Sequence, residues 1–216
     1  MELVTNPNEF FRRRAGREPK LMTPILTIIL PMSVVSGVYQ YFLASKLAEA
    51  FTGDLALLFK VSAYLGVVFS LIGSFVVWLI LALIMHGISA VFGGEGSFKR
   101  TLEFTGFGFL PFLIGSLITT PVALKYVLEA EVPKITVEML KEDPDIMTTV
   151  LKAVIPDEVV YSNVVINLAT LLWAVVIWSF AVKHARNLEF GKSFVAASVP
   201  AIIYGLYQIW SLMKLI

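Results

Sequence analysis

The chain has 216 residues, of which 57% are hydrophobic and only 15% are charged. Soluble domains carry about 25% charged residues, so this composition excludes an ordinary soluble protein and indicates an integral membrane protein. The absence of cysteine excludes disulfides, thiolate metal sites and a cysteine nucleophile. The formal net charge of +1 says little about partners, because in a membrane protein the division of charges between the two sides matters. No nucleic-acid partner is expected.

Residues 1–21 form a charged cytoplasmic segment without the features of a cleavable signal peptide. Asn6 as N-cap, Pro7 at the first helical position and a following Gly16 predict one short amphipathic helix. We expect this helix to lie in the membrane interface, with Phe10 and Phe11 among the acyl chains and its arginines on anionic head groups. A basic patch that binds a protein is the alternative. The basic residues are Arg12, Arg13, Arg14 and Arg17.

Five apolar runs follow, and each is long enough to cross a hydrocarbon core of ~30 Å at ~1.5 Å per residue. The second run exceeds one span, so we expect its first turns, with Lys60, to lie in the outer interface. The sequence therefore predicts an all-α, polytopic membrane helix bundle that occupies residues 22–216 as one domain. The expected transmembrane helices are Met22–Leu43, Leu55–Phe92, Phe104–Leu128, Val160–Val182 and Phe194–Ile216.

The loop between the second and third spans is rich in glycine. Gly93, Gly94 and Gly96 are expected to end the second span, because glycine adopts the left-handed conformation without steric cost, and Ser97 is expected to cap the next helix. That helix opens with residues that allow it to bend or to approach a neighbour closely, namely Gly106, Gly108 and Pro111.

Small residues recur at four-residue spacing on one face of the second span, at Gly66, Ser70 and Ser74. Such a stripe allows two helix backbones to pack closely in lipid. We therefore expect this face to contact another helix.

The loop from residue 129 to 159 is acidic, with eight Asp or Glu against three Lys. Within it, Asp145 is expected to cap a short helix that places Val150 and Val154 on one face and ends before Pro156. We expect this helix on the outer surface of the bundle.

Orientation follows from the distribution of Lys and Arg between the two sides of the membrane. Five spans place the chain ends on opposite sides. One side carries every arginine of the chain, together with Lys99 and Lys183. We therefore expect the N-terminus to be cytoplasmic and the C-terminus to face outward.

Several amides and threonines lie in the outer half of the expected spans, where each polar group must find a partner. One interpretation is that they form hydrogen bonds between helices, with Asn167 bonded to Gln40 or Gln208. The other is a polar pocket, open toward the acidic loop, that holds a small molecule or a lipid head group. The residues concerned are Gln40, Thr119, Thr120, Asn163, Asn167 and Gln208.

Two histidines, His86 and His184, lie near the cytoplasmic ends of the second and fourth spans, with Glu95, Glu103 and Glu189 in nearby loops. Converging helix ends would allow a zinc site, but no ligand-spacing motif is present. A histidine near a helix C-terminus is favoured by the helix dipole. We therefore expect no metal site and no cofactor.

Three sequence features together resemble the prokaryotic branch of the Yip (Ypt-interacting protein) domain family. They are Asn-Pro-x-x-Phe-Phe before the first span, Gly93-Gly94-Glu95-Gly96-Ser97-Phe98, and Thr105-Gly106-Phe107-Gly108-Phe109-Leu110-Pro111. The resemblance covers nearly the whole chain and implies an integral membrane protein. Eukaryotic members bind prenylated Rab-type GTPases, but their Asp-Leu-Tyr-Gly-Pro-like segment is absent here, so GTPase binding is not carried over.

The sequence thus predicts a non-enzymatic binding or membrane-organising protein of the cell membrane. Membrane lipids are the expected partners, together with a membrane protein or a second copy of the chain. A transporter or channel component that uses the outer-half polar pocket is the alternative. No span carries Asp, Glu, Lys or Arg well inside its core, which argues against ion-coupled transport and against acid–base catalysis within the membrane.

Overall fold

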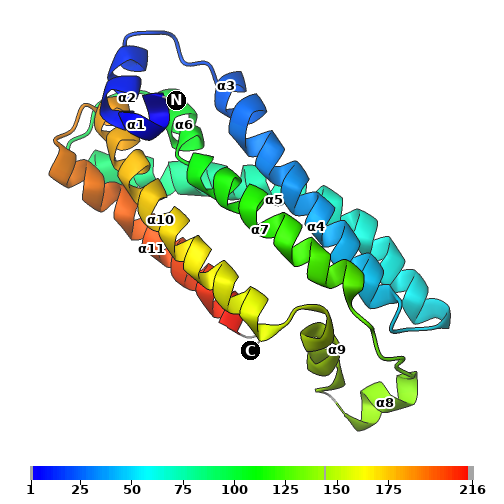
Figure 1. Cartoon of the computed structure of the whole chain (residues 1–216). Helices are drawn as coiled ribbons and strands as arrows, with labels where there is room; N and C mark the ends of the chain where they lie inside the picture. The colour runs from blue at the N-terminus through cyan, green and yellow to red at the C-terminus, as the bar shows by residue number, and fades with distance from the viewer. Residues whose placement is uncertain (1, 144, 214–216) are drawn as a thin grey trace.

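The computed structural model describes residues 2–143 and 145–213, and the regular secondary structure of these residues is entirely helical. The helices form an elongated bundle with α1 and α2 at one end and the last described turns of α11 toward the other (Figure 1). The predicted all-α fold with five spans is confirmed, although the last expected residue, Ile216, lies outside the described residues. The helical segments long and apolar enough to cross a membrane are Met22–Ala48, Gly53–Val91, Phe98–Glu129, Asp157–Arg186 and Phe190–Ser211.

The first span consists of α3 (Met22–Pro24), a π-helical turn (Ile25–Ile29) and α4 (Leu30–Ala48). Pro31 accounts for the turn, because proline has no N–H and its ring presses on the carbonyl four residues earlier. Just before it the helix widens, and the Leu30 N–H donates to the carbonyl of Ile25, five residues back. The span therefore stays continuous through its proline.

The second span is the single helix α5 (Gly53–Val91), which packs along α4 through small residues. Ser70 Oγ donates to the backbone oxygen of Ser33 at 3.2 Å. A Cβ added to Gly37 would lie 2.8 Å from Ser70 Oγ, and one added to Gly66 would lie 3.3 Å from Cβ of Gln40. The predicted packing of the small-residue stripe against another helix is confirmed.

The third span is broken into α6 (Phe98–Phe107) and α7 (Leu110–Glu129). The break occurs at Gly108, where an added Cβ would overlap the indole ring of Trp178. Trp178 Nε1 donates to the carbonyl of Thr105 at 2.9 Å, and Trp78 Nε1 donates to the carbonyl of Leu102 at 2.9 Å. The two indoles thus hold α6 in place by bonding its backbone, and the predicted close approach in this segment is confirmed.

The glycine loop before α6 is held by Arg186, the last residue of α10 (Asp157–Arg186). Arg186 is 4% exposed, and its guanidinium group donates to the carbonyls of Gly94 and Gly96 and, through Nε, to Ser89 Oγ at 2.9 Å. Ser97 Oγ accepts the first-turn N–H of α6, as expected for an N-cap. This loop is therefore a fixed connection between the ends of α5, α6 and α10.

The N-terminal segment forms α1 (Glu2–Thr5) and α2 (Pro7–Ala15), and Asn6 caps α2 as predicted. Phe11 is fully buried, with its ring centroid 4.9 Å from that of Phe104, and the Phe10 ring lies 5.1 Å from that of Phe107. The expectation that these two rings insert among acyl chains is therefore wrong. The aromatic face of α2 packs instead on an aromatic face of α6, so that its apolar surface is buried against protein rather than lipid.

The acidic loop contains α8 (Val137–Glu142) and α9 (Ile146–Val154). Val150 and Val154 are fully buried in a second core that includes Phe51 and Val127. The predicted helix is confirmed, but the Asp145 carboxylate makes no capping bond. Its backbone oxygen accepts the first-turn N–H groups instead.

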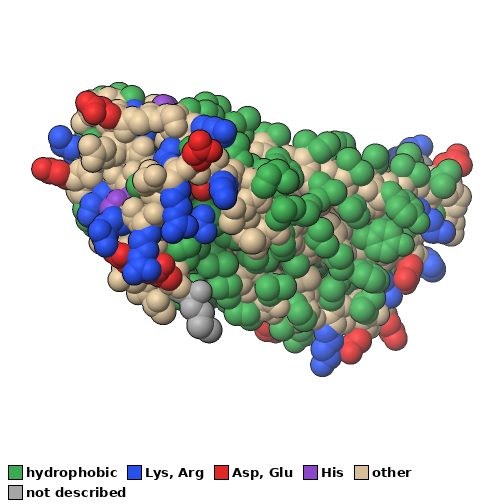
Figure 2. Space-filling view, turned by 90° about the horizontal axis from the view of Figure 1, so that it is seen from above, with side chains coloured by type: hydrophobic (Ala, Val, Ile, Leu, Met, Phe, Trp, Pro, Cys, Tyr) green, Lys and Arg blue, Asp and Glu red, His purple; other side chains and the backbone are tan. Residues whose placement is uncertain are grey.

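Charged side chains gather at the two ends of the molecule, with an apolar belt between them (Figure 2). We name these ends the α2 end, which carries α1, α2, α6 and the loop after α5, and the α9 end, which carries α8 and α9. Much of the belt is formed by exposed Leu, Ile and Val side chains of α5 and of α11 (Phe190–Met213). This distribution suits a protein whose middle lies in lipid and whose ends reach water.

Candidate functional site

A polar cavity of about 210 Å³ lies in the middle of the bundle, and all five spans contribute to its walls. Its apolar walls include Met32 and Phe112. Because an empty polar cavity in lipid leaves hydrogen-bonding groups without partners, such a feature requires water or a ligand. The polar lining residues are Ser36, Ser74, Ser116, Thr119, Asn167, Thr170, Tyr204 and Gln208.

Most of these polar groups are bonded within their own helix. Ser116 Oγ and Thr170 Oγ1 each donate to a backbone oxygen three residues earlier, at 2.8 and 3.0 Å. Asn167 Nδ2 donates to the carbonyl of Asn163 at 2.8 Å, and Gln208 Nε2 donates to the hydroxyl of Tyr204 at 2.9 Å. The Asn167 amide oxygen has no hydrogen bond to any other described residue. The amides of Asn167 and Gln208, which line the cavity, therefore keep hydrogen-bonding capacity that a ligand could use.

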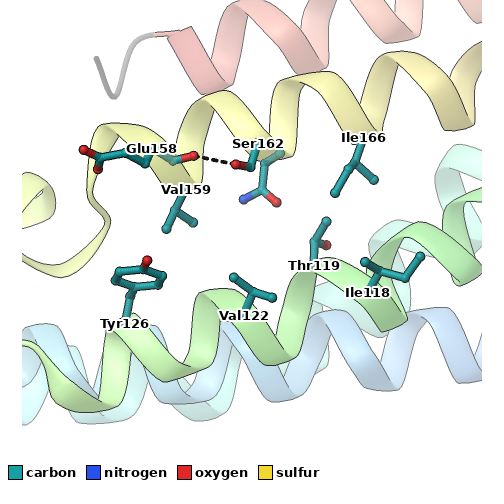
Figure 3. Close-up of a pocket in the computed structure, with 9 residues that line it drawn as sticks. Ile118, Thr119, Val122, Tyr126, Glu158, Val159, Ser162 and Ile166 are labelled. Carbon is teal, nitrogen blue, oxygen red and sulfur yellow. Dashed lines mark hydrogen bonds between the residues drawn. The ribbon is translucent and has the colours of Figure 1, made fainter.

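A lateral cleft of about 250 Å³ lies between α7 and α10, next to this cavity. Figure 3 shows Thr119 and Val122 of α7 facing Val159 and Ile166 of α10 across the gap, with Tyr126 at the end nearest Val159. Ser162 Oγ donates to the backbone oxygen of Glu158 at 2.7 Å. The cleft and the central cavity share Thr119 and Ile166, so the two spaces are neighbours.

The structure brings four of the six predicted polar residues to these two spaces. Thr119, Asn167 and Gln208 line the cavity, and Asn163 lines the cleft. Gln40 is exposed on α4, and Thr120 lies outside the lining of both spaces. The predicted hydrogen bond from Asn167 to Gln40 or Gln208 is wrong, because Asn167 bonds its own helix.

Other lining residues were not among the predicted site residues. Tyr204 precedes Gln208 by four residues, and Ser116 precedes Thr119 by three, so each pair shares a helix face. That spacing is the signal that could have revealed Tyr204 and Ser116. Ser36 has no comparable signal in the sequence, because small and polar side chains occur on several faces of α4.

The two histidines lie apart from the cavity, in the α2 end. His86 Nδ1 is 2.9 Å from Thr101 Oγ1, and His184 Nε2 is 2.8 Å from Asn8 Oδ1. Among residues 2–143 and 145–213, no three His, Asp or Glu side chains are grouped closely enough to hold a metal ion. The zinc alternative is therefore not supported.

The arginines of α2 are divided between solvent and protein. Arg12 and Arg13 are exposed and both pair with Glu9, at 2.7 and 2.6 Å. Hydrogen bonds from Arg12 and then Arg13 lower the pKa of Glu9 to about 2, so this carboxylate stays charged and offsets part of the basic charge. Arg17 is also exposed. Contact between these groups and anionic head groups stays a prediction.

A buried ion cluster lies beneath α2. Glu103 is 1% exposed and accepts from Arg100 Nη1 at 2.7 Å. Arg14 reaches the same carboxylate at 3.9 Å, and its guanidinium carbon lies 4.7 Å from the centroids of both the Phe10 and Phe107 rings. The cluster therefore ties α2 to α6 by charge as well as by aromatic packing.

The geometry is that of a helical membrane protein in which α2 closes one end. A family model described as the Yip1 domain matches residues 1–212 of the chain. The chain belongs to the Yip1 domain family. This Yip1-domain protein is a multi-pass integral membrane protein, and the resemblance predicted from the sequence is confirmed.

Among proteins similar to this Yip1-domain chain is "Uncharacterized protein MJ0794" of Methanocaldococcus jannaschii. The two are 40% identical over 123 residues, which cover 57% of this chain and 86% of that protein. No solved structure matches the chain. The relative is prokaryotic, as the sequence resemblance implies.

Proposed function

We propose that this Yip1-domain protein is a non-enzymatic membrane protein that binds a small polar molecule or lipid head group in its central cavity. The observation that carries the proposal is the convergence of polar side chains from all five spans, among whose described residues no hydrogen bond crosses the cavity. Structural hydrogen bonding between helices would pair these groups with one another. Groups that bond only their own helix keep capacity for a ligand.

The chemistry of the described lining favours binding over catalysis. The cavity lining contains hydroxyls and amides but no Asp, Glu, His, Lys or Arg. Acid–base and nucleophilic mechanisms in enzymes depend largely on such titratable groups. The site therefore has the means to recognise a ligand and lacks the usual means to transform one.

An aromatic layer beside the cavity favours binding over conduction. Phe112, on the cavity wall, packs on the fully buried Trp178 at 5.8 Å between ring centroids, and Trp178 packs on Phe109 at 5.3 Å. This layer lies between the cavity and the α2 end. Aromatic side chains thus separate the cavity from the α2 end, as a binding site allows and an open channel does not.

Removing the Asn167 amide should release the ligand without unfolding the protein. In Asn167→Leu, the loss of one ligand hydrogen bond should weaken binding roughly tenfold, the equivalent of about 1.4 kcal/mol. The measurement is mass spectrometry of molecules that remain bound to the full-length protein purified from its own membranes. Gln40→Leu is the matched control, because it removes an amide that lies outside the cavity. Equal retention of the same molecules in both variants would refute the proposed site.

The proposed orientation places the α2 end in the cytoplasm and the α9 end outside. It rests on the arginines, all of which lie at or near the α2 end. The chain has no cysteine, and Ser97 and Glu142 are exposed at opposite ends. In intact cells, an impermeant maleimide should label Glu142→Cys and spare Ser97→Cys. The reverse pattern would show that the orientation is inverted.

A further inference from the structure

An apolar groove of about 310 Å³ lies between α5 and α11 on the membrane-facing side of the bundle. Its two walls have the same spacing along the helix, at i, i+3, i+4 and i+7, so each wall is one helix face. The faces oppose each other without filling the space between them. The wall of α5 is formed by Val77, Ile80, Leu81 and Ile84, and that of α11 by Pro200, Ile203, Tyr204 and Tyr207.

Tyr204 connects this groove to the polar cavity, because it lines both. A smaller space that includes Ser70, Ser74 and Val77 also reaches Tyr204 from the α4 side. The Tyr204 hydroxyl accepts a hydrogen bond from Gln208, and its own O–H donates to no other described residue. A polar donor therefore lies where an apolar groove meets a polar cavity.

We infer that the ligand is an uncharged lipid alcohol whose acyl chain lies in the α5–α11 groove and whose hydroxyl head enters the cavity beside Tyr204. This inference rests on the proposed binding function and specifies its ligand class. An amphiphile matches the site because apolar and polar surfaces join at one residue. A chain alone would leave the cavity groups without partners.

The charge of the site decides between classes of lipid. Among the residues that line the cavity and the groove in the described part of the chain, none is charged. A phosphate brought into this space would lose its water without gaining a basic partner, which is strongly unfavourable. A hydroxyl head needs only the hydrogen bonds that Tyr204, Gln208 and Asn167 offer. The geometry thus favours a diacylglycerol-like lipid over a phospholipid with the same chains.

Photo-crosslinking in phosphatidylcholine vesicles tests the inference with the full-length protein. Two probes carry the same diazirine-bearing acyl chain, one as diacylglycerol and the other as phosphatidylglycerol. We expect diacylglycerol to label α5 and α11 more strongly than phosphatidylglycerol does. Equal labelling by both probes would indicate ordinary boundary lipid and would overturn the inference.

Three variants test whether the acyl chain lies in the groove and whether the hydroxyl head bonds Tyr204. Ile84→Trp should fill the groove and reduce diacylglycerol labelling several-fold, whereas Leu83→Trp, at an exposed position of α5 outside the groove, should leave it unchanged. Tyr204→Phe should reduce the preference for diacylglycerol by roughly tenfold, the effect of one lost hydrogen bond. Gel-filtration profiles and thermal unfolding check that each variant is folded. Equal labelling of the Ile84→Trp and Leu83→Trp proteins would contradict the placement of the chain.

The outcomes separate this inference from the proposed function. If Asn167→Leu releases a bound molecule but Ile84→Trp does not affect diacylglycerol labelling, the cavity is a binding site and the lipid assignment is wrong. If the groove is labelled with a preference for diacylglycerol that Asn167→Leu and Tyr204→Phe leave intact, the cavity does not hold the lipid head group and the inference is wrong. The proposed function is then decided by the retention of bound molecules in Asn167→Leu and Gln40→Leu.

Discussion

Replacement of Gly108 by Ala is expected to lower the free energy of unfolding by about 3 kcal/mol, the upper part of the usual range for overpacked cores. The added Cβ would overlap the indole ring of Trp178, which is fully buried and bonded to the carbonyl of Thr105. Moving the ring would disturb its buried packing and break its hydrogen bond to Thr105. Thermal unfolding of the purified protein in detergent measures the effect.

Gly73→Ala provides the matched control for this substitution. An added Cβ at Gly73 meets no atom within 4 Å, and alanine is the better helix former by up to about 1 kcal/mol. This variant should be as stable as the natural chain or more stable. In a Trp178→Leu background, Gly108→Ala should cost much less, because the ring that it meets is gone. A stable Gly108→Ala protein in the natural background would show that the close contact at the helix break is wrong.

Replacement of Glu103 by Ala should destabilise the protein by about 3–5 kcal/mol, the range for breaking a buried ion pair. The substitution leaves Arg100, which is 8% exposed, without its partner at 2.7 Å. It also removes the carboxylate that Arg14 of α2 approaches. We therefore expect both a lower unfolding temperature and faster proteolytic cleavage between α2 and α3.

Glu9→Ala is the control for the loss of an acidic ion-pair partner. Glu9 also bonds two arginines, but those arginines are exposed at the surface, where an ion pair contributes about 0–1 kcal/mol. Combining Arg100→Met with Glu103→Leu should recover much of the stability, because no charge is then left buried alone. If Glu103→Ala and Glu9→Ala have equal effects, Glu103 is not buried beneath α2.

The sequence predicts most of the fold because the length and spacing of apolar runs are local properties. The five spans and the helix that contains Val150 are read directly from such runs. The close approach near Gly108 is also predictable, because glycine and proline mark it. Neither feature requires knowledge of which helices are neighbours.

The wrong predictions concern side chains whose packing partner lies on a distant segment of the chain. An aromatic, basic helix such as α2 has the same pattern whether Phe11 packs on lipid or on Phe104 of a distant segment. The depth of the polar residues in the membrane can be estimated from residue number, but the rotation of each helix cannot. Thr119 and Thr120 have nearly the same depth, and only Thr119 lines the cavity.

The buried ion cluster shows the same limit. Arg100 and Glu103 are three residues apart on one helix, which normally indicates a weak pair on an exposed surface. Their burial depends on helices from other parts of the chain, since α6 packs on α5 and α10 and Arg14 of α2 reaches Glu103. The central cavity likewise depends on the convergence of five helices, and no single span predicts it.

The most direct test that the cavity holds the head of a lipid is an experimental structure of the full-length protein in lipid nanodiscs prepared from its own membranes. We expect non-protein density in the cavity bounded by Ser36, Ser116, Asn167 and Gln208, continuous past Tyr204 with a chain between α5 and α11. A cavity filled by side chains, or an Asn167 side chain that faces the surrounding lipid, would contradict it.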